Sequence, residues 1–267
     1  MSASTAQGRL KDALRQRKQT VGSWLTFPAE APAEIMVQAG FEWLVIDMEH
    51  APLDVSDAAR LIRVIDLAGA APLCRLPAND PVTAQRVLDA GASGIIVPRV
   101  ESAADARRAV DAAYYPSTGH RGVGLARAQA YGSGLKDYRV SMTETLVVIA
   151  MIESRNGVDE VASIAATPDL DGLFIGPYDL SASLGLIGEL DHPQVRAAEK
   201  RIVDTARAAG LACGLHVVHP TATAVRAAIQ DGYTFLALGV DMIFLNEAAT
   251  AAVAWAQPHV PILKGVG

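Results

Sequence analysis

The sequence predicts an α/β fold, a single-domain (β/α)8 TIM barrel, and three observations lead to that prediction. Eight short segments rich in Val, Ile and Leu recur along the 267 residues, and several of them show no polar alternation. Continuous apolar runs of this kind are typical of strands that are covered on both faces of a parallel sheet. Helical patterns lie between the segments, and the alternation fills about 250 residues, the usual length of such a barrel.

The predicted strands are spaced so that a helix fits after each of them. In chain order they are Val21–Phe27, Trp43–Met48, Pro72–Leu76, Gly94–Val100, Thr145–Glu153, Gly172–Gly176, Ala212–Val218 and Thr234–Val240. The main alternative is an open doubly wound sheet, which normally carries a glycine-rich turn after its first strand. The first strand here runs into TFPAEAP, which contains no glycine, so the sequence favours the closed barrel.

The helices are indicated by their apolar spacing and by the residues at their ends. A buried face at i, i+3, i+4 and i+7 recurs as Ala58, Leu61, Ile62 and Ile65 and as Ala106, Ala109, Val110 and Ala113. Residues typical of helix starts stand at Asp80-Pro81, Ser102 with Asp105, His192-Pro193 and His219-Pro220, and glycines typical of helix ends at Gly40, Gly91, Gly210 and Gly232. We also expect a short helix over Arg9–Arg17, in an N-terminal arm of residues 1–20 that precedes a barrel domain of residues 21–267.

Composition narrows the class of protein. Apolar residues make up 51% of the chain and charged residues 19%, which excludes a disordered chain. The net charge of −6 argues against a nucleic-acid partner, and the longest apolar run, Leu146–Ile152, is too short to span a membrane. Cys74 and Cys213 lie in apolar runs and are expected to be buried thiols of a reducing compartment. We therefore expect a cytoplasmic protein, with a transit peptide in residues 1–20 as the alternative.

Acidic residues stand where a barrel places its active site, at the carboxyl ends of the strands. Glu153 ends the fifth predicted strand, and Asp179 follows the sixth. Two carboxylates at adjacent strand ends suit a hard octahedral ion such as Mg²⁺ or Mn²⁺. Each acid also has a structural interpretation, because Glu153 could cap the next helix or pair with Arg155, and Asp179 could cap the helix that starts beside it.

Three further strands end in residues that can carry chemistry. His50 beside Asp47 indicates an imidazole that acts as general base or acid, with a simple loop histidine as the alternative. Arg75 ends an apolar strand and needs a charged partner there, either within the protein or on a substrate. The spacing His216-x-x-His219 is weak support for zinc, because residues i and i+3 of a strand point to opposite faces.

The lysines and glycines restrict the chemistry further. None of the five lysines falls at a strand end, which disfavours a Schiff-base aldolase and a pyridoxal-phosphate barrel. The cluster GHRGVG at residues 119–124 could cradle a phosphate. Because it follows a helix rather than a strand, we expect a flexible loop near the mouth of the barrel instead.

Five motifs, taken together, resemble one known family. They are IDMEHAP (Ile46–Pro52), CRLP around Arg75, RGVG (Arg121–Gly124), IES around Glu153 and FIGPYDLSASLG (Phe174–Gly185). On these motifs the sequence is identified as a member of the HpcH/HpaI class of metal-dependent, pyruvate-specific aldolases. The resemblance implies a carbon–carbon lyase that reversibly cleaves 4-hydroxy-2-oxo acids to pyruvate, or a close 2-oxo acid, and an aldehyde, through a metal-stabilised enolate.

The resemblance also implies roles for the residues of the reaction centre. Glu153 and Asp179 would hold Mg²⁺, Mn²⁺ or Co²⁺, with Zn²⁺ less favoured, and the ion would act as a Lewis acid. Arg75 would stabilise the enolate oxygen. His50, oriented by Asp47, would handle the proton of the C4 hydroxyl.

Further roles implied by the resemblance concern substrate binding and assembly. The stretch Gly176-Pro177-Tyr178-Asp179 would hold the pyruvate carboxylate through the backbone amides of Tyr178 and Asp179, and Trp24 would line the site. Asp89 matches a carboxylate that is donated across a subunit interface. Family members are usually hexamers, arranged as trimers of dimers, in which the last helix is exchanged between neighbours, and the apolar stretch Ala248–Ala256 would serve that exchange.

Four positions depart from the common pattern of the family. Met48, Met151, Tyr178 and His216 stand where glycine, glutamine, a small residue and leucine are frequent. His216 and Tyr178 would add hydrogen-bonding capacity, so we expect a small hydroxylated aldehyde as acceptor. The alternatives are the related citramalyl/malyl lyase branch that handles coenzyme A thioesters, a phosphate-binding barrel isomerase and a non-catalytic role. The residues leave the physiological aldehyde, the native metal and the stereoselectivity open.

Overall fold

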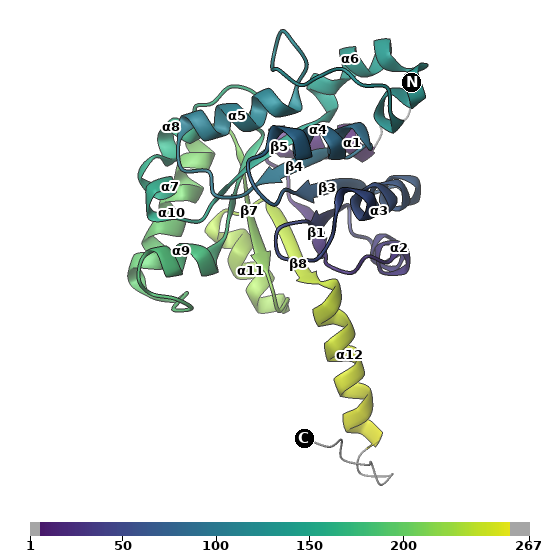
Figure 1. Cartoon of the computed structure of the whole chain (residues 1–267). Helices are drawn as coiled ribbons and strands as arrows, with labels where there is room; N and C mark the ends of the chain where they lie inside the picture. Colours follow the sequence, from purple (N-terminus) through teal and green to yellow (C-terminus); the bar gives the residue numbers. More distant parts are fainter. Residues whose placement is uncertain (1–5, 257–267) are drawn as a thin grey trace.

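The structure is a computed structural model, and it describes residues 6–256. Eight parallel strands close into a barrel in the order β1 to β8 (Figure 1). The strands are β1 Thr20–Leu25, β2 Trp43–Asp47, β3 Ala71–Arg75, β4 Gly94–Val97, β5 Val147–Ile152, β6 Gly172–Ile175, β7 Ala212–Val217 and β8 Phe235–Val240. The predicted (β/α)8 barrel is confirmed, and every predicted strand end lies within three residues of the observed one.

Helices surround the barrel in the intervals between the strands (Figure 1). They are α1 Ala6–Arg15, α2 Glu30–Gln38, α3 Val55–Ala68, α4 Pro81–Asp89, α5 Ala103–Ala113, the 3-10 helix η1 Arg127–Gly132, α6 Leu135–Thr145, α7 Arg155–Asp159, α8 Val161–Ala165, α9 Pro177–Ser183, α10 Pro193–Ala208, α11 Ala222–Asp231 and α12 Asp241–Ala256. The last of them, α12, points away from the barrel (Figure 1). No helix within residues 6–256 is long and apolar enough to cross a membrane.

The apolar core has two layers because alternate residues of each strand point to opposite sides of the barrel wall. The outer layer lies between the strands and the helices, and it contains the free thiols of Cys74 and Cys213, which are buried as predicted. The inner layer is filled by large rings, with Trp43 stacked on Phe235 at 4.0 Å between ring centroids. Trp43 has room because residue 22 is glycine, whose Cβ would lie 2.0 Å from the indole ring.

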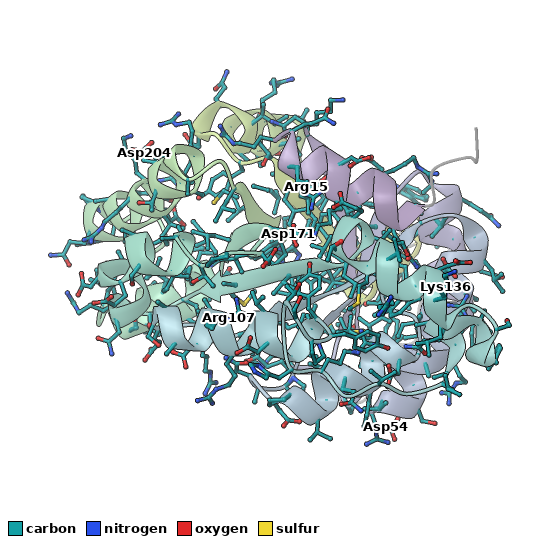
Figure 2. All side chains as sticks on the ribbon, turned by 90° about the horizontal axis from the view of Figure 1, so that it is seen from above. Arg15, Asp54, Arg107, Lys136, Asp171 and Asp204 are labelled. Carbon is teal, nitrogen blue, oxygen red and sulfur yellow. The ribbon has the colours of Figure 1, made fainter. Side chains whose placement is uncertain are left out.

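The first helix covers one end of the barrel, and it confirms the helix predicted around Arg9–Arg17. Leu10 and Leu14 of α1 pack into the inner apolar layer. Between them, the buried Lys11 donates to Tyr114 Oη at 2.8 Å and forms an ion pair with Asp171 at 3.0 Å. Figure 2 shows Arg15 of the same helix near Asp171. These contacts tie the N-terminal arm to the end of α5 and to the residue before β6.

Most helix ends follow the sequence prediction. Asp80 caps α4 by accepting the amides of Val82 and Thr83, and His192 caps α10. Ser102 caps α5, and all four predicted end glycines have positive φ angles, between +75° and +107°. The start predicted at His219-Pro220 is wrong by two residues, because α11 begins at Ala222 and its cap is the hydroxyl of Thr221.

The glycine cluster at residues 119–124 does not lie near the mouth, which corrects our expectation. It follows α5, which starts after the carboxyl end of β4 and runs back along the barrel. The cluster therefore lies at the amino end of the strands, and none of its residues lines the cavity described below.

Candidate active site

A cavity of about 360 Å³ lies at the carboxyl ends of the strands, where a barrel places its active site. Nine of its lining residues are among those predicted from the sequence: Trp24, Asp47, His50, Arg75, Gly176, Pro177, Tyr178, Asp179 and His216. The other lining residues are Thr26, Met151, Phe174, Ile175, Val240 and Met242. The lining residues come from seven of the eight strands, and neither Glu153 nor Asp89 is among them.

Asp47 and Arg75, at the ends of neighbouring strands, form a two-pronged ion pair. Arg75 Nε donates to Asp47 Oδ1 at 2.9 Å, and Nη2 donates to Oδ2 at 2.6 Å. Burial opposes ionisation, but the guanidinium holds the pKa of Asp47 below its usual range. The face of the guanidinium lies 4.5 Å from the ring centre of Trp24. Arg75 is therefore fixed in the cavity wall, with Nη1 outside the pair with Asp47 and 3.4 Å from Glu49 Oε2.

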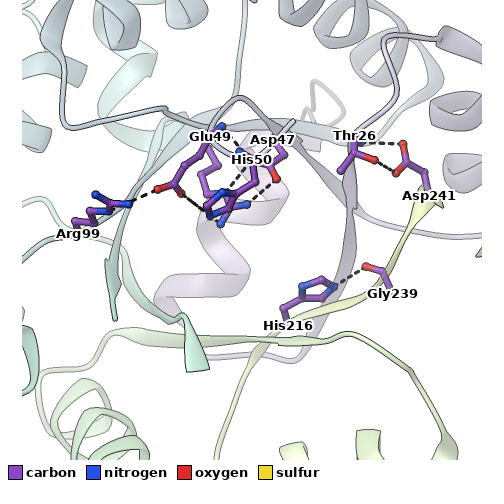
Figure 3. A network of polar contacts seen from close by, with 9 residues as sticks. Thr26, Asp47, Glu49, His50, Arg99, His216, Gly239 and Asp241 are labelled. Atoms are coloured by element: carbon purple, nitrogen blue, oxygen red, sulfur yellow. Dashed lines mark hydrogen bonds and ion pairs between the residues drawn. The ribbon is translucent and has the colours of Figure 1, made fainter. Parts of the chain in front are cut away.

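The predicted contact between Asp47 and the His50 ring is wrong. Besides Arg75 Nε, Oδ1 of Asp47 accepts from the backbone amides of Glu49 and His50, at 3.1 and 3.2 Å, and no hydrogen bond joins Asp47 to the His50 ring in residues 6–256. The carboxylate beside the imidazole is that of Glu49, with Oε2 3.9 Å from His50 Nε2 (Figure 3). Asp47 thus positions the loop that carries His50 rather than the ring itself.

Glu49 is a site residue that the sequence prediction missed. Its Oε2 is buried, has no hydrogen bond and lies 3.4 Å from Arg75 Nη1. Burial raises the pKa of Glu49, although the charge of Arg75 opposes the shift. The available signal was its place between Asp47 and His50, both of which were assigned to the site.

Glu153, at the end of β5, is held by backbone rather than by a cationic side chain. Its Oε1 accepts the amide of Arg99 at 2.7 Å, and Arg99 adopts a left-handed φ of +53° to present that amide. Burial raises the pKa of Glu153 to about 7, and the charges of Glu49 and Asp179 add to the shift. No ion pair joins Glu153 to Arg155 in the described chain, and the helix after Glu153 is capped by the side chain of Ser154.

Asp179 stands in the first turn of α9, but it is not the helix cap, which is the position of Gly176. The amides of Tyr178 and Asp179 belong to the same turn, and no backbone acceptor within the described chain takes them. In residues 6–256 no cluster of three or more His, Cys, Asp or Glu side chains could hold a metal. Glu153 and Asp179 are thus two carboxylates at adjacent strand ends whose charges act on each other.

His216 and His219, the alternative zinc ligands, lie in different surroundings. His216 lines the cavity, whereas His219 is exposed and lies 3.0 Å from Glu247 on α12. No lysine is among the residues that line the cavity. Neither a zinc pair at His216 and His219 nor a lysine nucleophile is formed by the described part of the site.

Asp89 lies outside the cavity of its own chain, at the end of α4. Its Oδ1 accepts from Arg121 Nη2 at 2.5 Å and from Gln129 Nε2 at 3.2 Å. The Arg121 side chain is fully buried and also donates to Tyr138 Oη at 2.9 Å. This cluster holds Oδ1 and leaves Oδ2 of Asp89 beside Gly124, where any added Cβ would lie 3.1 Å away.

Comparisons with known proteins agree on one family. The family model described as HpcH/HpaI aldolase/citrate lyase matches residues 20–248. A hydroxypyruvate/pyruvate aldolase of Paraburkholderia phytofirmans is 39% identical over 94% of this chain and 98% of its own. A 5-keto-4-deoxy-D-glucarate aldolase of Salmonella paratyphi A is 37% identical over 91% and 94%. The crystal structure of a family protein from Burkholderia cenocepacia has a TM-score of 0.88 at 38% identity, over 94% of this chain and 99% of its own.

The barrel, its acidic strand ends and these relatives define the protein as an enzyme that acts on carbon–carbon bonds, an aldolase-type lyase. The chain belongs to the HpcH/HpaI aldolase/citrate lyase family. Aldolases of this family generally depend on a divalent metal ion.

Proposed function

We propose that the protein is a metal-dependent aldolase that reversibly cleaves 4-hydroxy-2-oxo acids to pyruvate, or a close 2-oxo acid, and an aldehyde. The observation that carries the proposal is the position of Glu153 and Asp179 at the ends of adjacent strands, near enough for the charge of Asp179 to raise the pKa of Glu153. Asp179 lines the same cavity as Arg75 and His50. An anion-stabilising guanidinium, an imidazole and a two-carboxylate site are the groups that the reaction needs.

The residues present fit a hard divalent ion. Two carboxylates supply oxygen ligands, and Gly176 leaves open the space beside Glu153 Oε2. Burial raises the pKa of Glu153, and the charges of Glu49 and Asp179 add to the shift while that of Arg75 opposes it, so a bound cation would favour the ionised carboxylate. Glu153 and Asp179 would hold Mg²⁺, Mn²⁺ or Co²⁺. When bound, the ion supplies Lewis-acid stabilisation of the negative charge that develops on the 2-oxo acid.

The other roles in the reaction belong to groups of the protein itself. Arg75 Nη1, which takes no part in the two hydrogen bonds to Asp47, stabilises the enolate oxygen. The free amides of Tyr178 and Asp179 bind the carboxylate of the substrate, since the first turn of a helix offers unpaired N–H groups. His50, exposed at the mouth, accepts the proton of the C4 hydroxyl on cleavage and returns it on addition.

Exchange of the methyl protons of pyruvate with solvent, followed by NMR, tests the enolisation step directly. Glu153→Gln and Asp179→Asn are expected to abolish both metal binding and exchange, and EDTA is expected to do the same to the wild type. His50→Ala should impair aldol cleavage more than exchange. Exchange that persists in the metal-free double variant would refute the assignment.

The substrate and metal are addressed by a second measurement. Pyruvate release is screened over a series of 4-hydroxy-2-oxo acids with Mg²⁺, Mn²⁺, Co²⁺ and Zn²⁺. Release from citramalyl or malyl thioesters of coenzyme A alone would favour the lyase branch instead. The cavity argues against that branch, because Arg75 is the only Lys or Arg among its lining residues and it is paired with Asp47.

The proposal includes a homohexamer in which Asp89 serves the site of a neighbouring subunit and α12 is exchanged between subunits. It is supported by the exposed apolar side chains of α12, with Leu245 61% and Trp255 76% exposed, and by those near Asp89, with Val123 61% and Leu125 65%. Mixing the inactive variants His50→Ala and Asp89→Ala is expected to restore activity, because hybrid sites regain both groups. Failure to restore it in mixed hexamers would refute donation by Asp89.

The location of the protein is also part of the proposal. Buried, unpaired Cys74 and Cys213 support the cytoplasm, where thiols stay reduced. Fractionation of cells that express the full chain tests this.

A further inference from the structure

His216 stands at the inner face of β7, where the strand reaches the cavity. Side chains alternate along this strand, so that Cys213 and Leu215 face the outer core while Ala212 packs in the inner layer. At Gly214 an added Cβ would collide with the inner rings of Phe174 and Phe235. His216 continues this inward series and is its uppermost member, so its ring forms part of the cavity wall.

The ring of His216 is held in one orientation (Figure 3). Nε2 lies 2.8 Å from the carbonyl oxygen of Gly239, and the ring packs against Trp24 with 5.6 Å between centroids. The Gly239 carbonyl can only accept hydrogen bonds, and it also accepts from Ser23 Oγ at 3.1 Å. Nε2 therefore carries the hydrogen, and the neutral ring presents Nδ1 as a bare acceptor.

The acceptor nitrogen Nδ1 is available to a ligand. Within residues 6–256 no hydrogen bond reaches it, and it is not among the polar atoms sealed from solvent without a partner. Burial lowers the pKa of His216 to about 4, and the charge of Arg75 adds to the shift although the bond to Gly239 opposes it. The ring is thus uncharged at neutral pH and offers a lone pair to the cavity.

Few groups of the proposed substrates can pair with such a lone pair. The carboxylate, the 2-oxo group and the enolate oxygen are all acceptors, so none of them can donate to Nδ1. A hydroxyl can donate. The neighbouring cavity walls are apolar side chains, among them Trp24, Phe174 and Val240, so Nδ1 would lose its hydrogen bond to water if an apolar substrate group filled the space.

On the basis of the proposed aldolase function, we infer that His216 is a specificity-determining residue that accepts a hydrogen bond from a substrate hydroxyl other than the one made in the reaction. The hydroxyl belongs either to the 2-oxo acid, as at C3 of a 3-hydroxy-2-oxo acid, or to the aldehyde, as in a 2-hydroxyaldehyde. The chemistry recognised is the same in both cases.

Four combinations of donor and acceptor distinguish a hydroxyl on the 2-oxo acid from a hydroxyl on the aldehyde. Aldol addition is measured with pyruvate or hydroxypyruvate as donor and with acetaldehyde or glycolaldehyde as acceptor, for the wild type, His216→Leu and His216→Asn. The wild type is expected to favour the hydroxylated member of one series by about tenfold in kcat/KM, the usual size of one hydrogen bond. His216→Leu should remove that preference, and His216→Asn, whose amide oxygen accepts, should retain part of it.

The matched control is His219→Leu, which removes an exposed imidazole from the same β7 loop, outside the cavity lining. It should keep the wild-type preference. A preference that His216→Leu leaves unchanged in both series would overturn the inference. So would an equal loss of rate for all four pairs, since that would indicate a role in the reaction itself or in folding.

Two readouts separate this inference from the proposed function. Pyruvate methyl exchange by the wild type, measured on the same samples, reports whether the proposed enolisation occurs. A wild type that exchanges and turns over substrate, with no effect of His216→Leu on preference, contradicts only the inference, whereas a wild type that does neither contradicts the proposed function as well. Histidine ¹⁵N spectra at pH 7 should show a bare Nδ1 whose resonance shifts with the hydroxylated substrate, and a protonated Nδ1 would overturn the inference.

Discussion

A Cβ atom at Gly176 would lie 2.6 Å from Oε2 of Glu153. The glycine is therefore required by its neighbour across the β5–β6 pair rather than by its own backbone, whose φ of −99° suits any residue. Gly176→Ala is expected to displace the Glu153 carboxylate and to lower kcat/KM by about 100-fold, the scale of a misplacement near 1 Å in an active site. Calorimetric titration with Mg²⁺ should show weaker binding in the same variant.

Gly40→Ala is the control for that substitution. Gly40 has a φ of +107° with nothing within 4 Å of an added Cβ, so the variant costs backbone strain but touches no site residue. It should lower the free energy of unfolding by about 1 kcal/mol and leave kcat/KM unchanged. If Gly176→Ala behaves like Gly40→Ala, the glycine does not serve Glu153.

The two-pronged pair of Asp47 with Arg75 leads to the second prediction. Asp47→Asn cannot accept both N–H groups of the guanidinium and removes the nearer of the two carboxylates beside this buried cation. We expect the free energy of unfolding to fall by about 3 kcal/mol and kcat to fall by about 100-fold. Urea unfolding and steady-state cleavage check both numbers, and Arg75→Lys should match the loss of kcat because lysine lacks the fork.

The barrel could be predicted from the sequence because its strands are buried on both faces. Runs such as those around Val148 and Ile96 lack alternation for that reason, and they are distinct from the periodic helices between them. The ends of the strands were predicted less accurately than their existence. β4 stops at Val97, three residues before the predicted end, because the chain turns at Arg99 into the left-handed conformation that serves Glu153.

The site could be predicted as a set of residues but not as a set of contacts. The (β/α)8 rule places polar strand ends at one face, and that is enough to bring Asp47, Arg75 and His50 together. It does not decide which partner a carboxylate takes. Asp47 lies beside Arg75 in the β2–β3 register, and a buried guanidinium with two parallel N–H groups outcompetes an exposed imidazole for it.

The third prediction concerns the dependence of stability on pH. The folded pKa of His216 is about 4, below the usual value of 6.5, so the unfolded chain binds a proton more readily between these pH values. Stability contributed by the neutral ring is therefore complete above pH 6.5 and is lost progressively as the pH falls to 4. The loss amounts to roughly 3 kcal/mol.

The variant His216→Gln lacks the titrating imidazole, so comparing it with the wild type measures the contribution of the ring. The difference in unfolding free energy between wild type and variant, followed by urea unfolding from pH 7.5 to 4, should decline by that amount with falling pH. Taking the difference cancels the carboxylates, among them Glu153, whose raised pKa acts in the opposite direction. A difference that stays constant across the range would show that the ring titrates normally.

The fourth prediction concerns Asp241, which joins the two ends of the closed barrel at the base of α12 (Figure 3). Its buried carboxylate accepts the Thr26 amide at 2.8 Å, the Thr26 hydroxyl at 2.6 Å and the Phe27 amide at 2.9 Å, so it links the end of β1 to the end of β8. Asp241→Ala leaves these donors without their acceptor and should lower the free energy of unfolding by about 2–3 kcal/mol. Asp241→Asn keeps one acceptor oxygen and should lose less. Because the same residue is the first of α12, Asp241→Ala should also shift the light-scattering mass toward smaller assemblies, whereas an unchanged mass and an unchanged urea midpoint would contradict the role of Asp241 as the anchor of that helix.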